Sequence, residues 1–311
     1  MSRVFIFGGT GFIGSGIAEE FISHGYKVFS LARSEEKEIQ LEKNEITGIR
    51  ADIQETSKWY PIASTCDIII DASTFNHMDQ LLVLEQIKKI KSHDNPNLFA
   101  IYTGGLWTFG EHDQVVNEHS KPCIPLGFEF INHRISIQNE YMKIGACVMS
   151  PGALYGMSGS YVAQLYFKPI LEGKGTYTGY GDKDQWLVTV HRQDLARAYR
   201  LAAENPSVAK GQLFIVFSHQ EKVIDIIQAA ATNEQILLKG IHFLPPDQKD
   251  NYTIGLGLSY RADCSKIRNL LKWYPVMPSV VSDISRYMKS YKASNKKDSS
   301  KKQVPLSVPQ N

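Results

Sequence analysis

A glycine-rich turn near the start of the chain restricts the fold more than any other feature of the sequence. The apolar run RVFIFGG (3–9) is typical of a buried strand, and FIGSGIAEEFISHG (12–25) follows it with a helical pattern. Gly8 permits a tight turn, Gly11 lets the backbone approach a pyrophosphate, and Gly14 lets the helix pack close to the strand. This strand–turn–helix unit predicts a cradle for the phosphates of a dinucleotide.

The start of the helix completes this cradle. Its unpaired N–H groups and the positive end of its dipole point toward the phosphates. Phe12 and Ile13 are the first residues after Gly11. We predict that they contact the ligand together with the glycines.

Strand-like and helix-like segments alternate through the first half of the chain. The strand patterns after the turn cover 26–33, 46–53, 66–73, 97–105 and 146–156, and the clearest helical patterns cover 78–93 and 130–145. Regular alternation means a parallel sheet with helices on both faces. The sequence therefore predicts an α/β fold with a Rossmann-type doubly wound parallel sheet and a smaller C-terminal substrate lobe.

The amino-acid composition changes after residue 156, where Gly, aromatic and polar residues become frequent. Helical and strand patterns then return before a lysine-rich end with almost no apolar content. These changes predict a dinucleotide-binding domain of 1–157 plus 186–232, a substrate lobe of 158–185 plus 233–291, and a disordered tail of 292–311.

The ends of the next strands indicate which dinucleotide fits. The second strand ends at Arg33 rather than at an acidic residue, and a guanidinium suits a 2′-phosphate. We therefore predict NADP(H) in preference to NAD(H), with a solvated Arg33 as the alternative. Asp52 and Ile53 are placed to meet the adenine, and Ala72 and Ser73 to line the path to the second ribose.

The composition argues against several classes of partner. The net charge is +2, so no strong field favours nucleic acid, and no apolar run is long enough to span a bilayer. The 4 cysteines are scattered without a C-x-x-C pair, which predicts neither a metal site nor a disulfide framework. We expect a cytoplasmic protein with a small-molecule ligand.

Several motifs together resemble one family. They are GGTGFIG (8–14), CDIIIDAS (66–73), IYTGGLWTFG (101–110), SPGALYG (150–156), VTVHRQDLARAY (188–199) and SKIRNLLKWYP (265–275). The chain resembles an extended or atypical short-chain dehydrogenase/reductase of the NAD-dependent epimerase/dehydratase kind. The resemblance covers the chain up to about residue 290.

The resemblance implies a catalytic triad that this chain does not carry. In that family a Ser or Thr after the fifth strand positions the substrate oxygen, a Tyr moves a proton, and a Lys lowers the Tyr pKa and holds the nicotinamide ribose. The matching positions here are Gly105 (or Gly104, one residue off), Phe130 and Arg134. No Tyr anywhere in the chain is followed four residues later by Lys.

These replacements remove the customary proton transfer. Phe130 has no exchangeable proton, and Arg134 keeps its proton at physiological pH, although it can donate hydrogen bonds to a ribose. Losing a general acid typically costs about 10²–10⁴ in rate. The alternative is that both residues are ordinary helix positions and that the alignment has slipped.

Other side chains are candidates for the missing acid. Thr103 and Tyr155 are our catalytic candidates beside Arg134, and Pro151 stands where the family has the proline of an Arg-Pro pair, at the cofactor site. Further candidates for the acid are Tyr102, Thr108, His133, Tyr161 and His191. Candidates for the ligand pocket are Tyr161, Gln164, Tyr180 and Trp186.

Three functions remain open. The first is an NAD(P)(H)-binding protein with non-standard or lost catalysis. The second is an active NADP-dependent oxidoreductase or epimerase that acts on a carbonyl or nucleotide-sugar substrate through another acid. The third is an RNA-binding relative, which the weak net charge disfavours. Relatives often form homodimers through the helices matching 78–93 and 130–145, and the apolar face of the first predicts either that contact or packing on the sheet.

Overall fold

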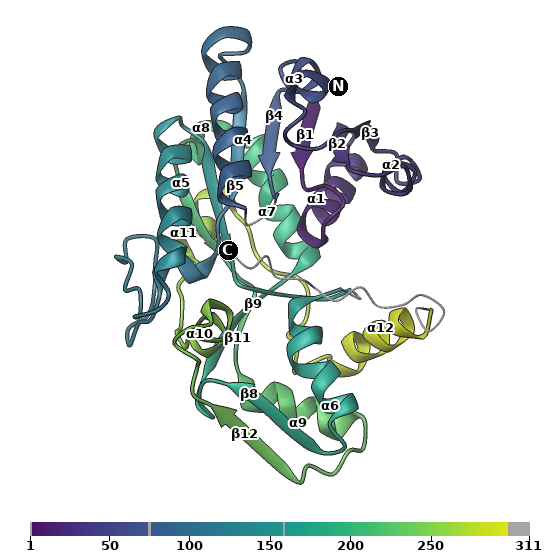
Figure 1. The fold of residues 1–311 in the computed structure, drawn as a ribbon, viewed down its shortest axis with the longest axis vertical. Helices are drawn as coiled ribbons and strands as arrows, with labels where there is room; N and C mark the ends of the chain where they lie inside the picture. The colour runs from purple at the N-terminus through teal and green to yellow at the C-terminus, as the bar shows by residue number, and fades with distance from the viewer. Residues whose placement is uncertain (1, 74–75, 158, 298–311) are drawn as a thin grey trace.

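The computed structural model describes residues 2–73, 76–157 and 159–297. Figure 1 shows a larger part that carries the N-terminal strands and a smaller lobe built around β8, β12 and α9. The C-terminal part of the predicted tail, 298–311, lies outside the described residues.

A seven-stranded parallel sheet forms the larger part. Its strands, in spatial order, are β3 (Thr47–Arg50), β2 (Lys27–Ala32), β1 (Arg3–Phe7), β4 (Ile68–Asp71), β5 (Phe99–Thr103), β6 (Cys147–Pro151) and β10 (Leu213–Val216). The strand order reverses between β1 and β4, and ligands of such sheets bind at this point, outside the carboxyl ends of the strands. The predicted Rossmann-type fold is confirmed.

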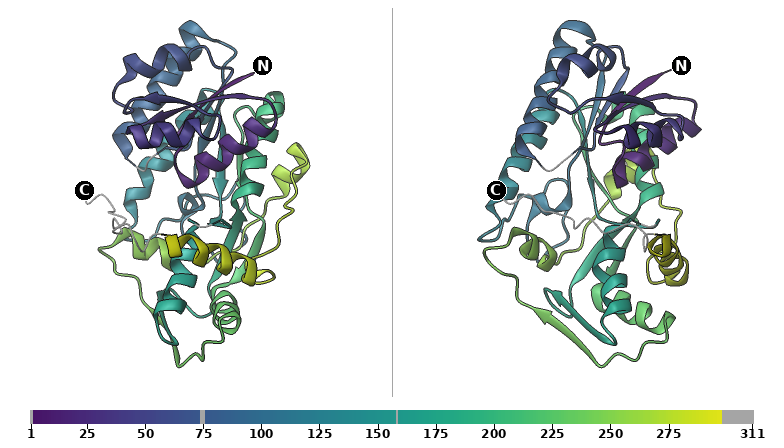
Figure 2. Two further views of the ribbon diagram at one scale, coloured as in Figure 1. Left: turned by 90° about the vertical axis from the view of Figure 1, so that its right-hand side faces the viewer. Right: turned by 45° about the vertical axis from the view of Figure 1, so that its right-hand side comes forward.

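Helices cover both faces of this sheet (Figure 2). On β5, the ring of Tyr102 stacks on Tyr141 of α5, whereas the hydroxyl of the next residue, Thr103, bonds to Tyr199 of α7. Successive strand residues point to opposite faces, so α5 and its neighbour α4 cover one face while α7 and its neighbour α1 cover the other. The helices of this part are α1 (Phe12–Ser23), α2 (Glu35–Glu42), α3 (Thr56–Ala63), α4 (His77–Lys89), α5 (Asn132–Lys143), α7 (Arg192–Glu204), α8 (Pro206–Ala209) and α11 (Ser265–Leu271), with the short turns η1 (Ile90–Asp94), η2 (Leu106–Phe109) and η3 (Glu129–Ile131).

The smaller lobe has its own sheets and core. Its strands are β7 (Ala153–Tyr155), β9 (Trp186–His191) and β11 (His219–Lys222) in one sheet, and β8 (Thr176–Tyr180) and β12 (Gly240–Leu244) in another. Its helices are η4 (Ala163–Phe167), α6 (Lys168–Glu172), α9 (Val223–Asn233), α10 (Asn251–Gly257) and α12 (Ile284–Lys297). None of the helices in the described ranges is long and apolar enough to cross a membrane.

Two predicted boundaries differ from the structure. We assigned 186–232 to the dinucleotide-binding domain, but α9 packs into the core of the smaller lobe through Val223, Ile226 and Ile227. The apolar face of that helix needs a partner, and the smaller lobe supplies it. The disordered tail was predicted from residue 292, but α12 continues through 292–297, so the prediction was wrong for those residues.

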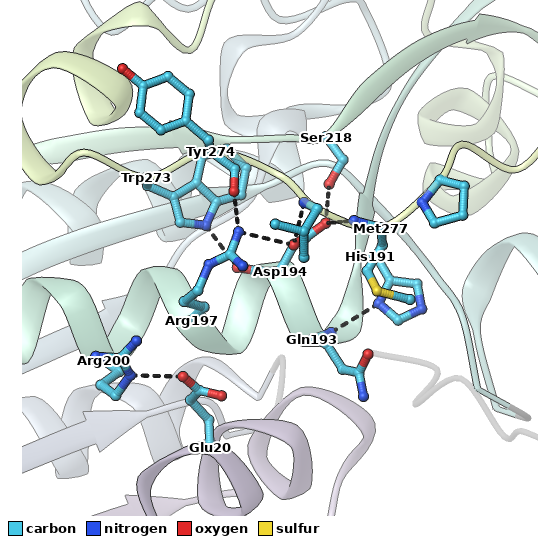
Figure 3. Close-up of polar contacts among 12 residues, drawn as sticks. Glu20, His191, Gln193, Asp194, Arg197, Arg200, Ser218, Trp273, Tyr274 and Met277 are labelled. Carbon is cyan, nitrogen blue, oxygen red and sulfur yellow. Dashed lines mark hydrogen bonds and ion pairs between the residues drawn. The ribbon is translucent and has the colours of Figure 1, made fainter. Parts of the chain in front are cut away.

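A buried carboxylate joins the C-terminal segment to α7 (Figure 3). Asp194 is 0% exposed, and its Oδ1 accepts hydrogen bonds from Arg197 and from the Val276 N–H at 3.1 and 3.0 Å. Its Oδ2 accepts from the Ser218 hydroxyl and the Met277 N–H, both at 3.2 Å. This contact fixes the chain that leads from the large sheet into the smaller lobe, and therefore fixes one lobe against the other.

Candidate functional site

The predicted cofactor residues gather along one edge of the large sheet. They follow parallel strands, and the carboxyl ends of parallel strands lie on the same side. The turn that begins at Gly8 follows β1, Arg33 follows β2, Asp52 lies just after β3 and Ala72 follows β4, while Pro151 ends β6 and is buried. Residues far apart in the sequence therefore meet at the switch point.

The glycine turn is shaped so that only glycine fits at two of its positions. Gly8 has a φ of +81°, and a Cβ there would lie 2.2 Å from the carbonyl oxygen of Ala72. A Cβ on Gly14 would lie 2.2 Å from the carbonyl oxygen of Gly8. These contacts bring the start of α1 against β1 and β4, as the sequence predicted.

The start of α1 faces outward from this turn. Gly11 is its N-cap residue and makes no side-chain cap, and a Cβ there would meet only the Gly8 oxygen, at 3.1 Å. Gly11 is exposed, and Phe12 and Ile13 in the first turn are half-buried. A pyrophosphate fits this arrangement because the first backbone N–H groups and the positive end of the helix dipole attract anions, and no side chain of the described residues caps them.

Ser30 holds the turn from behind, and the sequence analysis missed it. This residue of β2 is 0% exposed. Its hydroxyl donates to the Ile6 carbonyl at 2.8 Å and accepts from the Gly9 N–H at 3.2 Å. A single small polar residue inside the otherwise apolar strand KVFSLA was the signal that could have identified it.

Charged and polar side chains collect where the adenosine of a dinucleotide would lie. Arg33 and Asp52 are exposed, and Ile53 is half-buried. The amide of Gln54 donates to the carboxylate of Asp79. Burial raises the pKa of Asp79, Asp52 raises it further, and the positive charge of Arg33 lowers it. Arg33 therefore shares this end of the site with a carboxylate.

The end of β4 carries a buried carboxylate that the sequence analysis did not select. Asp71 is 2% exposed, and it accepts hydrogen bonds from the Ser73 hydroxyl at 2.5 Å and from the Tyr141 hydroxyl at 2.8 Å. Burial raises the pKa of Tyr141 well above its usual range, and Asp71 adds to the effect. These bonds fix the backbone at Ala72 and Ser73, which we predicted to line the cofactor path.

The two glycines in the Ser/Thr slot differ in what surrounds them. A Cβ on Gly104 would lie 2.9 Å from Gln138 Oε1 and from Ser150 Oγ, beneath α5. A Cβ on Gly105 would meet nothing within 4 Å. A side chain at Gly105 would therefore enter open space, whereas one at Gly104 would enter the packed interior.

The Tyr slot, Phe130, lies on η3 just before α5, and the Lys slot, Arg134, lies in the first turn of α5. Phe130 is half-buried, and its ring centroid lies 5.1 Å from that of Phe128. Arg134 is 6% exposed, and its guanidinium donates to the carbonyl oxygen of Thr103 at 3.1 Å. The cation therefore lies against the carboxyl end of β5.

Two of our catalytic candidates have their hydroxyls turned to other partners. Thr103 bonds to Tyr199 at 2.8 Å on the α7 face of the sheet. Tyr155 is 1% exposed and donates to the Pro278 carbonyl at 2.9 Å within the smaller lobe. Both hydroxyls therefore have partners other than a ligand in this structure, and the two assignments stay predictions. Strand alternation and a second core, which decide these directions, are not visible in the local sequence.

Two of the remaining acid candidates, Thr108 and His191, also have hydrogen-bond partners elsewhere. The Thr108 hydroxyl donates to the Gly105 carbonyl at 2.7 Å, and His191 Nδ1 accepts from the Gln193 N–H at the start of α7. Burial lowers the pKa of His191 to about 4 and raises that of Tyr102 to about 12. The buried hydroxyls of Tyr102 and Tyr161 make no hydrogen bond within the described residues, and burial raises the pKa of Tyr161 far above its usual range.

His133 differs from Thr108 and His191. Its Nε2 is buried and makes no hydrogen bond within the described part of the chain. Its ring lies between those of Phe130 and His77, with centroid distances of 6.1 and 4.9 Å. Burial lowers the pKa of His133, and the charges of His77 and Arg134 lower it further. The imidazole is therefore mainly neutral near pH 7 and offers a free ring nitrogen.

The pocket candidates lie in or beside the smaller lobe. Gln164 is on η4, Tyr180 ends β8 and Trp186 begins β9, and all of them are half-buried. In the ranges that the structure describes, no group of three or more His, Cys, Asp and Glu side chains could hold a metal ion.

Sequence comparisons point to the same edge of the sheet. The model of the NAD dependent epimerase/dehydratase family matches residues 4–80, which contain the glycine turn. A sterol-4-alpha-carboxylate 3-dehydrogenase, decarboxylating, of Dictyostelium discoideum is 40% identical over 70 residues, which are 22% of this chain and only 21% of that enzyme. The uncharacterised Saccharomyces cerevisiae protein YLL056C is 24% identical over 91% of this chain and 97% of its own length.

A solved structure matches nearly the whole chain. The UDP-glucuronic acid 4-epimerase of Bacillus cereus, in complex with UDP-glucuronic acid and NAD, superposes with a TM-score of 0.78 over 94% of this chain and 99% of that one. The sequence identity is 18%, so this likeness shows the fold.

Proposed function

The family match and the fold support the extended short-chain dehydrogenase/reductase family, of the NAD-dependent epimerase/dehydratase kind, and on that premise we propose that this protein binds a nicotinamide dinucleotide without the family's proton-transfer triad. The observation that carries the proposal is the uncapped start of α1 behind Gly8 and Gly14. A bound nicotinamide would supply hydride chemistry. The chain's own residues determine whether a proton transfer accompanies the hydride transfer.

Arg134 takes the place of the Lys in this proposal. Its guanidinium donates to the carbonyls of Thr103 and Gly104 at the carboxyl end of β5, and a guanidinium can donate to several acceptors, as a ribose contact requires. It cannot release a proton at physiological pH. Arg134 therefore orients the ligand, and Gly105 and Phe130 contribute no hydroxyl.

A thermal-shift titration tests the binding. Ligand that binds only the folded state must raise the unfolding midpoint, by roughly 2.7 kcal/mol of stability at one hundred times the Kd. We expect NADPH and NADP⁺ to raise the midpoint of the full chain. If NADPH, NADP⁺, NADH and NAD⁺ all leave it unchanged, the proposal is wrong.

We also propose that NADP(H) binds better than NAD(H), because Arg33 ends β2 at the adenosine end of the site. Charge-assisted hydrogen bonds contribute about 1.5–3 kcal/mol, so Arg33→Ser should weaken NADPH binding roughly 10–100-fold and leave NADH binding nearly unchanged. Arg50→Ser is the matched control, since Arg50 is also exposed but pairs with Glu38. Equal affinities for both cofactors in the parent chain would contradict this preference.

A second candidate function is supported by the free ring nitrogen of His133. In an oxidoreductase of this kind His133 Nε2 would give a proton to the substrate oxygen or take one from it. His133→Gln should then lower NADPH turnover of a carbonyl substrate about 10²–10⁴-fold and remove the pH dependence that an imidazole imposes, while NADPH affinity stays unchanged. Turnover that survives this change would exclude His133 as the acid.

A further inference from the structure

Ser73, which follows β4, lies directly against the glycine turn. A Cβ on Gly8 would lie 3.1 Å from Ser73 Cα and 2.2 Å from the Ala72 carbonyl oxygen, so the two segments touch. Ser73 is half-buried, so part of it is open to a molecule at the carboxyl edge of the sheet. It is therefore placed to contact a dinucleotide whose pyrophosphate lies at the start of α1.

The hydroxyl of Ser73 has a fixed direction for its proton. It donates to Asp71 Oδ1 at 2.5 Å, and the Ser73 N–H donates to the same oxygen at 3.1 Å. A carboxylate can only accept hydrogen bonds, and an O–H···O⁻ bond of this length is among the strong ones. The proton is therefore committed to Asp71, and the lone pairs of Ser73 Oγ remain for a ligand.

Asp71 is itself held in place by α5. It is 2% exposed, and its Oδ2 accepts from the hydroxyl of buried Tyr141 at 2.8 Å. Burial raises the pKa of Tyr141 well above its usual range, so this hydroxyl stays a donor. The Tyr141 ring also stacks on Tyr102 of β5, with the centroids 4.5 Å apart. The carboxylate thus cannot turn away from Ser73 without losing hydrogen bonds that a buried charge needs.

The order of the sheet places Ser73 on the nicotinamide side of the glycine turn. β2 and β4 both pair with β1, one on each side. Arg33 follows β2, where the adenosine ribose of a dinucleotide lies, and the turn after β1 faces the pyrophosphate. A ligand that crosses this edge continues past β4, so the ribose nearest Ser73 is the one that carries the nicotinamide.

An oxygen that can only accept distinguishes between the groups of this ligand. Phosphate oxygens are negative and accept hydrogen bonds, so they favour the N–H groups at the start of α1. Ribose hydroxyls can donate, so they suit Ser73 Oγ. The two neighbouring segments therefore select different parts of a dinucleotide.

We propose that Ser73 Oγ accepts a hydrogen bond from a hydroxyl of the nicotinamide ribose, and that Asp71 is the positioning residue that keeps Ser73 Oγ an acceptor. The inference rests on the proposed function, because this ribose belongs to the dinucleotide. It gives Asp71 a role in binding that acts through Ser73.

Calorimetric titration with NADPH and with adenosine 2′,5′-bisphosphate, which lacks the nicotinamide half, tests the contact. Because one hydrogen bond is lost, Ser73→Ala should weaken NADPH binding roughly 3–10-fold and leave the affinity for the bisphosphate unchanged. Ser218→Ala is the matched control and should change neither affinity, since Ser218 also bonds to a buried carboxylate, that of Asp194, but follows β10 at the edge of the sheet.

A double-mutant cycle tests the positioning role. Asp71→Asn should weaken NADPH binding when Ser73 is present, because an amide can donate to Ser73 Oγ and compete with the ribose. The same change should have no further effect in Ser73→Ala, whereas a purely structural loss would weaken binding by the same factor in both backgrounds. Tyr141→Phe, which removes the donor to Asp71 Oδ2, replaces Asp71→Asn in the cycle if that variant does not fold.

The outcomes separate this inference from the proposed function. Unchanged NADPH affinity in Ser73→Ala would overturn the contact, and equal weakening of both ligands would overturn its assignment to the nicotinamide ribose. Additive effects in the cycle would overturn the positioning role of Asp71. In each of these cases the parent chain still binds NADPH, whereas a parent chain that binds no pyridine nucleotide would overturn the proposed function and this inference with it.

Discussion

Buried polar groups on the two faces of the large sheet differ in how many are paired, although Arg192 Nε on α7 also makes no hydrogen bond among the described residues. On the α7 side, both carboxylate oxygens of Asp194 and its backbone carbonyl accept hydrogen bonds, the last from Trp273 at 2.8 Å. On the α5 side, below the proposed nicotinamide end, buried atoms of Tyr102, His133, Gln138 and Ser150 make no hydrogen bond among the described residues.

Buried polar groups that are paired within the protein stabilise the fold, whereas buried polar groups without a protein partner are available to a ligand or to water. A buried carboxylate is tolerated only when its oxygens are fully paired, and Asp194 meets that condition within the protein. An unpaired buried donor or acceptor costs free energy, so it persists where something other than the fold uses it. Removing the paired carboxylate of Asp194 should therefore reduce stability strongly, whereas removing one of the unpaired groups should reduce it little.

The largest expected effect comes from removing the paired carboxylate. Asp194→Ala leaves Arg197, Ser218 and two backbone N–H groups without their acceptor, and breaking such a buried contact costs about 3–5 kcal/mol. Urea denaturation should show this loss. Asp113→Ala, at an exposed position in a connecting segment, should change the free energy of unfolding by less than about 0.5 kcal/mol. Similar stabilities for both variants would break the comparison.

The next effect concerns His191, at the start of α7. Burial holds its pKa at about 4, below the ordinary value of 6.5, so the folded state favours the neutral ring. The contribution of the neutral His191 ring to the free energy of unfolding is complete above about pH 6.5. It is lost as the pH falls toward 4, because His191 of the unfolded chain binds a proton at a higher pH than His191 of the folded chain. The loss is roughly 3 kcal/mol.

A substitution isolates this contribution. Asn retains an acceptor for the helix cap, so His191→Asn should remove that part of the acid destabilisation between pH 7 and 4.5. His119→Asn, at an exposed position, should leave the acid destabilisation between pH 7 and 4.5 unchanged. An unchanged pH dependence in His191→Asn would show that the buried ring does not resist protonation.

Two buried serines should differ in how much their hydroxyls contribute to the free energy of unfolding. Ser30 and Ser150 are both 0% exposed, but only the Ser30 hydroxyl has partners in the described structure. Ser30→Ala leaves the Ile6 carbonyl and the Gly9 N–H unpaired and should cost about 1–3 kcal/mol, whereas Ser150→Ala should be neutral or stabilising. Chemical denaturation measures both, and equal losses would contradict the distinction.

Much of the fold could be predicted because its signals are local. The glycine spacing, the apolar strands and the helical patterns lie within short windows, and they placed β1 to β6 and α1, α4 and α5. The second core could not be predicted, because α9 has an apolar face that either lobe could cover. The continuation of α12 through 292–297 escaped notice, since the polar composition of that segment does not exclude a helix.

Only part of the candidate site could be predicted from the sequence, because some of its features depend on tertiary structure. Glycines that permit close approach are visible in a motif, but the direction of a hydroxyl depends on the tertiary structure. Thr103 points to α7 because of strand alternation, and Tyr155 points into the smaller lobe. Ser30 and Asp71 act through partners in other segments of the chain, so no local pattern reveals them.

Calorimetric titration of NADPH into the parent chain and into Gly11→Asp tests whether the start of α1 binds the pyrophosphate of the dinucleotide. Gly11 has an ordinary φ of −84° and caps α1, so Asp should fold there and cap the helix as well or better, while its charge occupies the phosphate position. We predict that the parent chain binds NADPH and that the folded variant does not. Equal binding by both, or no binding by the parent chain, would contradict the account.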